Sequence, residues 1–217
     1  MTSVEYLGKY QLTQSDACFK LGRDSVLLAG FCTLRPKWTV CDLGCGVGSL
    51  LLLTAQREEN LTRVGIELDP TAAELARKNL ADNALSGTIL TGDLREKSLL
   101  RGDQFHLVLS NPPYFRAGSG RSGGQARMDD TCSVLDLCRT AGRLTRTGGR
   151  FALVYSPERL AELFAALQKA RLEPKRMQLL SYHRTKAPYA VLVEAVKEGG
   201  PGLDILPTHY QTEDRLT

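Results

Sequence analysis

The chain has 217 residues, of which 42% are hydrophobic and 24% are charged, a composition typical of one globular domain with a substantial core. No stretch approaches twenty consecutive apolar residues, which excludes a transmembrane helix, and the first residues lack a secretory signal pattern. The net charge of +4 permits a polyanionic partner without requiring one. We therefore expect a cytoplasmic protein.

The cysteines and histidines form no recognisable metal or disulfide pattern. No C-x-x-C pair occurs among the six cysteines, and the three histidines lie far from one another in sequence. Several cysteines fall in apolar or helical contexts, where a thiol packs as a small hydrophobic side chain. We expect reduced, structural thiols and predict no metal site.

Short apolar runs alternate with helical patterns along the chain. Strands are expected at 39–44, 63–69, 87–93, 105–111 and 150–156, with two more at 176–183 and 190–197. Helices are expected at 49–58, 71–84, 133–144 and from Ser156 onward. This alternation predicts a Rossmann-like, doubly wound α/β fold with a mostly parallel, seven-stranded sheet.

No repeat or linker divides the chain. A single domain is expected over 1–217, with an N-terminal extension at 1–36, a core at 37–197 and an irregular tail at 198–217. In a doubly wound sheet, ligands bind at the carboxyl ends of the strands. The turns after the predicted strands are therefore where a site is expected.

The turn after the first core strand reads D-L-G-C-G-V-G and contains Asp42, Gly44, Gly46 and Gly48. Its glycines allow the backbone to approach a ligand closely, where a Cβ would collide. The dinucleotide-binding fingerprint would require a glycine at position 49, which is Ser49. The turn therefore favours a nucleoside with an amino-acid tail over a pyrophosphate.

Acidic residues follow the next two strands. Glu67 ends the second strand about twenty residues past the glycines, the position from which a carboxylate accepts hydrogen bonds from ribose hydroxyls. Asp93 follows the third strand and is placed to accept a hydrogen bond from an adenine amino group. A single such acid is commonly only a loop or capping residue, but these stand at strand ends in register with the glycine turn.

The fourth strand ends in Asn111, Pro112, Pro113 and Tyr114. Neither proline can donate to a sheet, and each ring fixes φ, so the pair ends the strand and stiffens the backbone beside the asparagine. Three arginines follow in a Gly- and Ser-rich loop: Arg116, Arg121 and Arg127. Alone, such a basic loop is more often a solvated surface than a polyanion contact.

Together these motifs resemble the class I S-adenosylmethionine (SAM)-dependent methyltransferases that carry an Asn-Pro-Pro-Tyr motif. The resemblance is carried by "CDLGCGVGSLLLL", "GIELD", the "GD" at 92–93 and "SNPPYF". It implies the class I methyltransferase fold, SAM as cofactor, and methyl transfer to a planar nitrogen such as adenine N6, guanine N2 or a glutamine amide. It also implies a set of SAM-binding residues: Asp24, Asp42, Gly44, Gly46, Gly48, Glu67, Asp93 and Asn111.

The same resemblance implies catalytic roles for Asn111, Pro112, Pro113 and Tyr114. The Asn111 side-chain oxygen and the Pro112 carbonyl are expected to accept the two N–H groups of the target amine, which aims its lone pair at the methyl group. The prolines hold these acceptors still, and Tyr114 offers a ring on which an extruded base stacks.

The segment at 10–31 is similar to the one that precedes the core in tRNA adenine-N6 methyltransferases acting on valine tRNA. In that family a Gly-Thr-Asp stretch before a Leu-Leu helix packs beside the cofactor. Gly22 and Asp24 match it, and Arg23 replaces the threonine. The resemblance thus implies an RNA substrate, with Arg116, Arg121 and Arg127 contacting its phosphates.

Three alternatives stay open. Glutamine-N5 methylation of a release factor uses nearly the same motif, but that family carries an additional N-terminal helical domain. Guanine-N2 methylation of ribosomal RNA is associated with a duplicated N-terminal half. A non-catalytic RNA-binding protein on this scaffold would have no need for the glycine turn, the ribose acid and the Asn-Pro-Pro-Tyr motif together.

Overall fold

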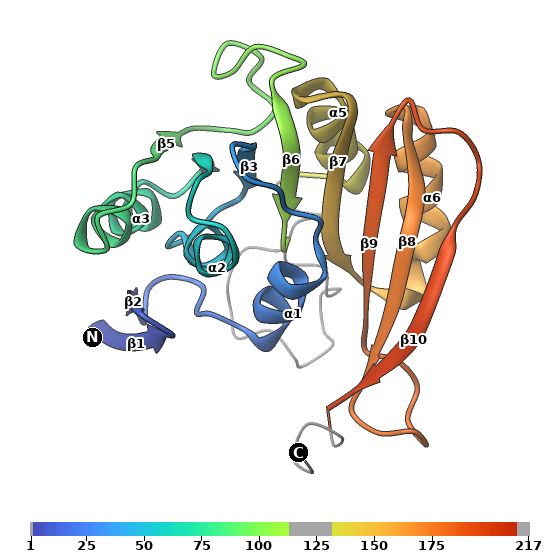
Figure 1. The fold of residues 1–217 in the computed structure, drawn as a ribbon, viewed down its shortest axis with the longest axis horizontal. Helices are drawn as coiled ribbons and strands as arrows, with labels where there is room; N and C mark the ends of the chain where they lie inside the picture. Colours follow the sequence, from blue (N-terminus) through green and yellow to red (C-terminus); the bar gives the residue numbers. More distant parts are fainter. Residues whose placement is uncertain (1, 113–131, 212–217) are drawn as a thin grey trace.

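The computed structural model describes residues 2–112 and 132–211, and its centre is an eight-stranded sheet (Figure 1). The strands lie in the order β10-β8-β9-β7-β6-β3-β4-β5. Those pairing in parallel on one side are β3 (Thr39–Leu43), β4 (Thr62–Glu67), β5 (Thr88–Thr91), β6 (Phe105–Ser110) and β7 (Thr145–Tyr155). The predicted doubly wound α/β fold is confirmed, and β3 and β6 meet where the strand order reverses.

The other side of the sheet differs from the expectation by one strand. β9 (Ala190–Lys197) runs antiparallel to β7 and to β8 (Leu172–Ser181). These are the two strands that the sequence predicts near the end of the core. The tail is not irregular, because β10 (Asp204–Tyr210) pairs in parallel with β8 and makes the count eight instead of seven. Pro207 interrupts this pairing, and β10 lies at the sheet edge with no fully buried residue. Its pattern therefore lacks the alternation that marks a strand.

Helices cover both faces of the sheet. They are α1 (Arg23–Phe31), α2 (Ser49–Arg57), α3 (Pro70–Asp82), α5 (Val134–Leu144), the short η1 (Pro157–Arg159) and α6 (Leu160–Lys169). The Asp69 side chain accepts a hydrogen bond from the Thr71 N–H and caps α3, with Pro70 in its first turn. Ser133 and Asp136 form a capping box at the start of α5. α1 packs on α2, and α5 packs on α6.

A two-stranded hairpin, β1 (Thr2–Leu7) and β2 (Tyr10–Ser15), packs beside α3. Fully buried Asn79 of α3 joins it to the glycine turn. Its Oδ1 accepts from the Thr13 N–H at 2.8 Å, and its Nδ2 donates to the carbonyls of Thr13 and Val47 at 2.9 and 2.8 Å. These bonds fix the glycine turn against both α3 and the hairpin.

The core lies between the sheet and its helices and contains one buried charge cluster. Glu194 of β9, with no exposed surface, accepts hydrogen bonds from Arg150 at 2.8 Å, Arg176 at 3.2 Å and the backbone N–H of Thr33 at 2.7 Å. This cluster ties the end of α1 to the sheet. All six cysteines lie in the described residues with free thiols. No described helix is long and apolar enough to cross a membrane.

Candidate active site

A cavity of about 450 Å³ opens at the carboxyl ends of β3, β4, β5 and β6. Its wall combines the segment before α1, the glycine turn, the turns after β4 and β5, and the end of β6. The volume lies in the range typical of small-molecule sites, about 300 to 1,000 Å³. The structure thus brings together residues that the sequence places on four separate strand ends.

The glycine turn exposes its backbone to this cavity. Gly44 and Gly46 have φ values of +71° and +54°, in the left-handed region that favours glycine, and a Cβ on either would meet no atom within 4 Å. Both glycines line the cavity. Gly48, the residue before α2, is not among the residues that line the cavity, and a Cβ on it would lie 3.4 Å from the Cβ of Ala76 in α3.

Asp42 lines the cavity with a buried carboxylate that is only 1% exposed. Neither of its oxygens has a hydrogen-bond partner among the described residues. Burial, with a smaller contribution from the nearby Glu67 charge, raises the pKa of Asp42 from its ordinary value to about 8. A buried acid with no partner in the protein is suited to a cationic ligand group.

Glu67 stands at the end of β4 in a fixed orientation. Its Oε2 accepts from the Gly46 N–H at 2.8 Å, and its Oε1 accepts from the Asp69 N–H at 2.9 Å. Each carboxylate oxygen has a second lone-pair direction, so the group still accepts hydrogen bonds from a ligand. The glycine turn and the acid therefore form one unit.

Asp93 also lines the cavity, but its carboxylate is engaged by a neighbour. The guanidinium and backbone N–H of Arg95 donate to it, with Arg95 Nε 2.9 Å from Asp93 Oδ1. These bonds lower the pKa of Asp93. The Arg95 contact has no counterpart in the sequence prediction, which assigned this acid to an adenine amino group.

Asn111 lies at the rim of the cavity, directly after β6. Its Nδ2 donates to the hydroxyl of Ser25 in α1 at 2.9 Å, which leaves Oδ1 as the other polar atom of the amide. The preceding Ser110 anchors the strand end by donating to the Leu43 carbonyl at 2.8 Å. Pro112 lines the same cavity. The remaining predicted residues lie outside the described part of the chain: Pro113, Tyr114, Arg116, Arg121 and Arg127.

Asp24 does not line the cavity, although its neighbour Ser25 does. Asp24 instead hydrogen-bonds the hydroxyl of Tyr189, at the start of β9. Three further cavity residues were not predicted from the sequence: Ser25, and the large apolar side chains of Phe19 and Leu68, which are 61% and 56% exposed. Strand-end patterns reveal none of these three, because they depend on how separate segments fold together.

Comparisons with known proteins agree with this geometry. The family model "methyltransferase small domain" matches residues 20–171. The chain belongs to this family. A tRNA1(Val) (adenine(37)-N6)-methyltransferase of Porphyromonas gingivalis is 32% identical over 205 residues, covering 89% of this chain and 80% of that protein. One of the same name from Dickeya chrysanthemi is 36% identical over 159 residues, covering 70% and 62%.

Solved structures of other proteins have a fold similar to that of this methyltransferase. A predicted O-methyltransferase, Atu636 from Agrobacterium tumefaciens, superposes with a TM-score of 0.71 at 25% identity and covers 87% of this chain and 88% of its own. TYW2 of P. horikoshii, solved in complex with MeSAdo, has a TM-score of 0.65 at 15% identity and covers 91% and 72%. The predicted resemblance to methyltransferases is confirmed, and we expect SAM as the cofactor of this enzyme.

The cavity of the methyltransferase fits SAM chemically. SAM carries positive charge, and Asp42 supplies a buried carboxylate with no partner among the described residues. It also carries ribose hydroxyls, and Glu67 supplies acceptor oxygens held by two backbone N–H groups. The open space at Gly46 allows close approach to the backbone. These three residues are the ones that we expect to hold the cofactor.

Proposed function

We propose that this methyltransferase transfers the methyl group of SAM to N6 of an adenine in tRNA, acting in the cytoplasm. The observation that carries the proposal is the 32% identity, over nearly the whole chain, to an enzyme named for adenine 37 of tRNA1(Val). The asparagine amide at the rim of the cavity supports it, because this group matches the chemistry of an exocyclic amine. Adenine 37 of valine tRNA is the target we assign.

The exocyclic amine of adenine is a poor nucleophile, because its lone pair is delocalised into the ring. Asn111 Oδ1 and the Pro112 carbonyl each accept one N–H of this amine, which turns the lone pair toward the cavity. Ser25 preorganises the acceptor by holding the other branch of the Asn111 amide at 2.9 Å. Acceptors fixed in advance stabilise the developing charge without reorganising during the reaction.

When bound, SAM supplies an electrophilic methyl group. Asp42 and Glu67 hold the cofactor from the cavity wall, and Asn111 and Pro112 hold the amine at the rim. The amine needs no base before attack, since it carries its proton until the nitrogen has become cationic and then loses it readily. The absence of a histidine or lysine from the predicted Asn-Pro-Pro-Tyr motif is therefore consistent with this chemistry.

Transfer from labelled SAM to bulk tRNA, ribosomal RNA and a release factor tests the proposal. We expect label in tRNA only, with transfer reduced at least a hundredfold in Asn111→Ala while SAM binding persists. Label in ribosomal RNA would favour guanine N2 as the acceptor, and label in the release factor would favour a glutamine amide. SAM binding without transfer to any acceptor would contradict the enzymatic proposal as a whole.

A further inference from the structure

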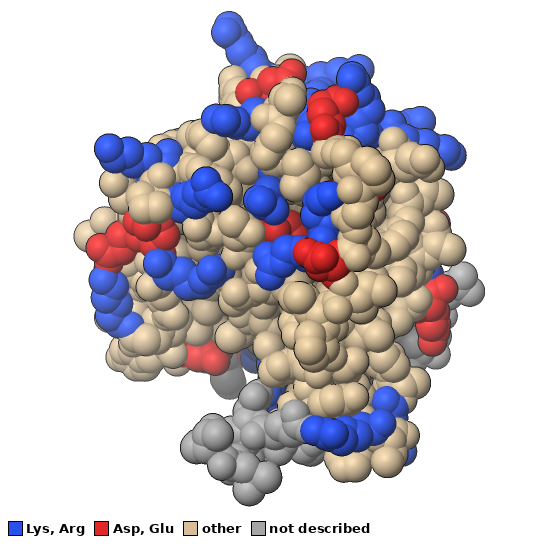
Figure 2. Space-filling model, turned by 45° about the vertical axis from the view of Figure 1, so that its right-hand side comes forward, with Lys and Arg blue, Asp and Glu red and all other residues tan. Residues whose placement is uncertain are grey.

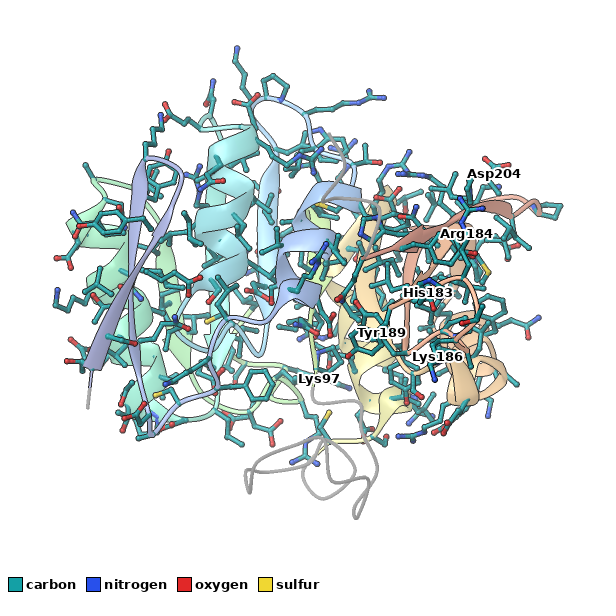
Figure 3. All side chains as sticks on the ribbon, turned by 90° about the horizontal axis from the view of Figure 1, so that it is seen from below. Lys97, His183, Arg184, Lys186, Tyr189 and Asp204 are labelled. Carbon is teal, nitrogen blue, oxygen red and sulfur yellow. The ribbon has the colours of Figure 1, made fainter. Side chains whose placement is uncertain are left out.

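The loop joining β8 and β9, residues 182–189, lies at the same edge of the sheet as Asn111. β9 runs antiparallel to both β7 and β8, so β8 points in the direction of β7 and of its parallel neighbour β6. The ends of β6 and β8, at Ser110 and Ser181, therefore face the same way. Figure 3 views the molecule from this side and shows His183, Arg184, Lys186 and Tyr189 on one part of that edge.

The backbone of this loop is held in one shape by hydrogen bonds. The hydroxyl of Ser181, a side chain only 1% exposed, lies 2.8 Å from the His183 carbonyl and 3.0 Å from that of Lys186. The Lys186 N–H donates to the His183 carbonyl at 3.0 Å, and the Gln211 N–H donates to the Ser181 carbonyl at 3.1 Å. These bonds connect the loop to β8 and to the residue after β10, and a loop held in this way loses less entropy on binding.

An aromatic pair stands on this scaffold. Tyr182 is 48% exposed and stacks on Tyr189, with ring centroids 4.4 Å apart and an interplanar angle of 24°. Tyr189 is nearly buried, and its hydroxyl accepts from Gln211 Nε2 at 2.9 Å. Burial raises the pKa of Tyr189 to about 12, so the hydroxyl keeps its proton and donates to Asp24. Tyr182 is therefore a half-exposed ring on a rigid support.

Cationic residues follow the exposed ring in the loop. Residues 182–187 are all exposed and include Arg184 and Lys186, while the loop contains no acidic residue. The Arg184 guanidinium lies 5.3 Å from the ring centroid of Tyr210 at the end of β10. Figure 2 shows Lys and Arg side chains at the lower end of the molecule, where Figure 1 places the β8–β9 loop. Within the described residues, Lys186 has no ion-pair partner.

We propose that the β8–β9 loop binds an unpaired stretch of the RNA substrate: Tyr182 stacks on a base, and Arg184 and Lys186 contact phosphates. An exposed aromatic ring interleaved with cations is the arrangement by which proteins bind single-stranded nucleic acid, since every base offers a π-face and every nucleotide a phosphate. The inference rests on the proposed function, which supplies an RNA substrate at this edge.

The loop is also connected to the catalytic rim through a short series of contacts. Tyr189 hydrogen-bonds Asp24 in the first turn of α1, and the next residue, Ser25, holds the amide of Asn111. RNA on the loop therefore lies against the same support that orients the acceptor for the target amine. An adenine extruded from the bound stretch would be at the same edge of the sheet as Asn111.

Binding measurements on matched variants of the full chain test this proposal. Tyr182→Leu is expected to raise the Kd for fluorescently labelled tRNA about tenfold, whereas Tyr182→Phe keeps the ring and changes it less than twofold. Arg184→Gln with Lys186→Gln should reduce the slope of log Kd against log salt by about 1.5. The control pair, Lys169→Gln with Arg171→Gln, removes the same charge at the opposite end of β8 and should leave the slope unchanged.

SAM affinity is measured for every variant and should stay within twofold of the unsubstituted enzyme, which shows that the fold and the cavity are intact. Equal tRNA affinity and salt slope in the loop and control pairs, with an enzyme that still methylates tRNA, would overturn the docking surface alone. An unsubstituted enzyme that methylates no RNA would overturn the proposed function and this inference with it.

Discussion

The side-chain amide of Asn111 donates to the hydroxyl of Ser25 at 2.9 Å, joining the end of β6 to the first turn of α1 across 86 residues of sequence. This contact lies at the rim of the cavity that holds Asp42 and the glycine turn. The hydrogen bond restricts rotation about the two side-chain bonds of Asn111 and so orients its Oδ1 as an acceptor. We take Ser25 to be a positioning residue that acts through Asn111.

Ser25→Ala should lower kcat about fivefold, since a neutral hydrogen bond contributes about 1 kcal/mol and the Asn111 amide would then rotate. KM for SAM should change less than twofold. Ser25→Thr keeps the hydroxyl and should restore most of the rate. Steady-state kinetics check this split, and a kcat equal in the alanine and unsubstituted enzymes would refute the positioning role.

Asp42 predicts a pH dependence of stability in the absence of ligand. The unfolded carboxyl group loses its proton near pH 4, whereas the folded one keeps it to about pH 8. Between these values the folded state binds the extra proton, so the free energy of unfolding falls as pH rises, by up to about 1.4 kcal/mol per pH unit. Its contribution is complete below pH 4 and lost above pH 8.

Urea denaturation between pH 4 and pH 9 measures this slope, and Asp42→Asn should remove it while raising stability at pH 8. The same substitution should weaken SAM binding at least tenfold, because the cavity loses the charge that pairs with the cationic cofactor. Calorimetry in two buffers should detect proton release when SAM binds near pH 7. A binding reaction without proton release would argue against Asp42 as the partner.

Gly46→Ala tests the close approach of the backbone to the cofactor. At φ +54° a side chain costs about 1 kcal/mol in backbone strain, and the new methyl group would enter the cavity. SAM affinity should fall at least tenfold. Gly30→Ala is the matched control, since Gly30 lies in α1 with open space around its Cβ and should be neutral or slightly stabilising.

Glu194 predicts a large effect on stability. Glu194→Gln removes the shared partner of Arg150 and Arg176 from a position with no exposed surface, and should destabilise the fold by about 3 kcal/mol. Glu198→Gln, which breaks an ion pair with the exposed Arg171, should cost less than about 1 kcal/mol. Comparable costs for the two variants in chemical denaturation would contradict the assigned role of the buried cluster.

The sequence predicted the site best where chemistry follows a strand. Asp42, Glu67, Asp93 and Asn111 each end or follow a parallel strand, and parallel strands bring their carboxyl ends to one edge. The same reasoning could not find Ser25, because its contact depends on the packing of α1 beside β6.

The sequence did not predict β10 or the contact between Asp93 and Arg95. β10 contains Pro207 and has no fully buried residue, so neither alternation nor an apolar run marks it as a strand. The assignment of Asp93 to a ligand stays a prediction, and residue spacing did not reveal that Arg95 also reaches its carboxylate from two residues away. Such side-chain pairing depends on the turn geometry after β5, which residue spacing alone does not determine.

The central claim is tested most directly by mass spectrometry of nuclease fragments from valine tRNA, after incubation with SAM and either the enzyme or Asn111→Ala. We predict one added methyl group, recovered as N6-methyladenosine from the fragment containing adenine 37, and none with the variant. A methyl group on another base, or unmethylated tRNA from an enzyme that binds SAM, would contradict the account.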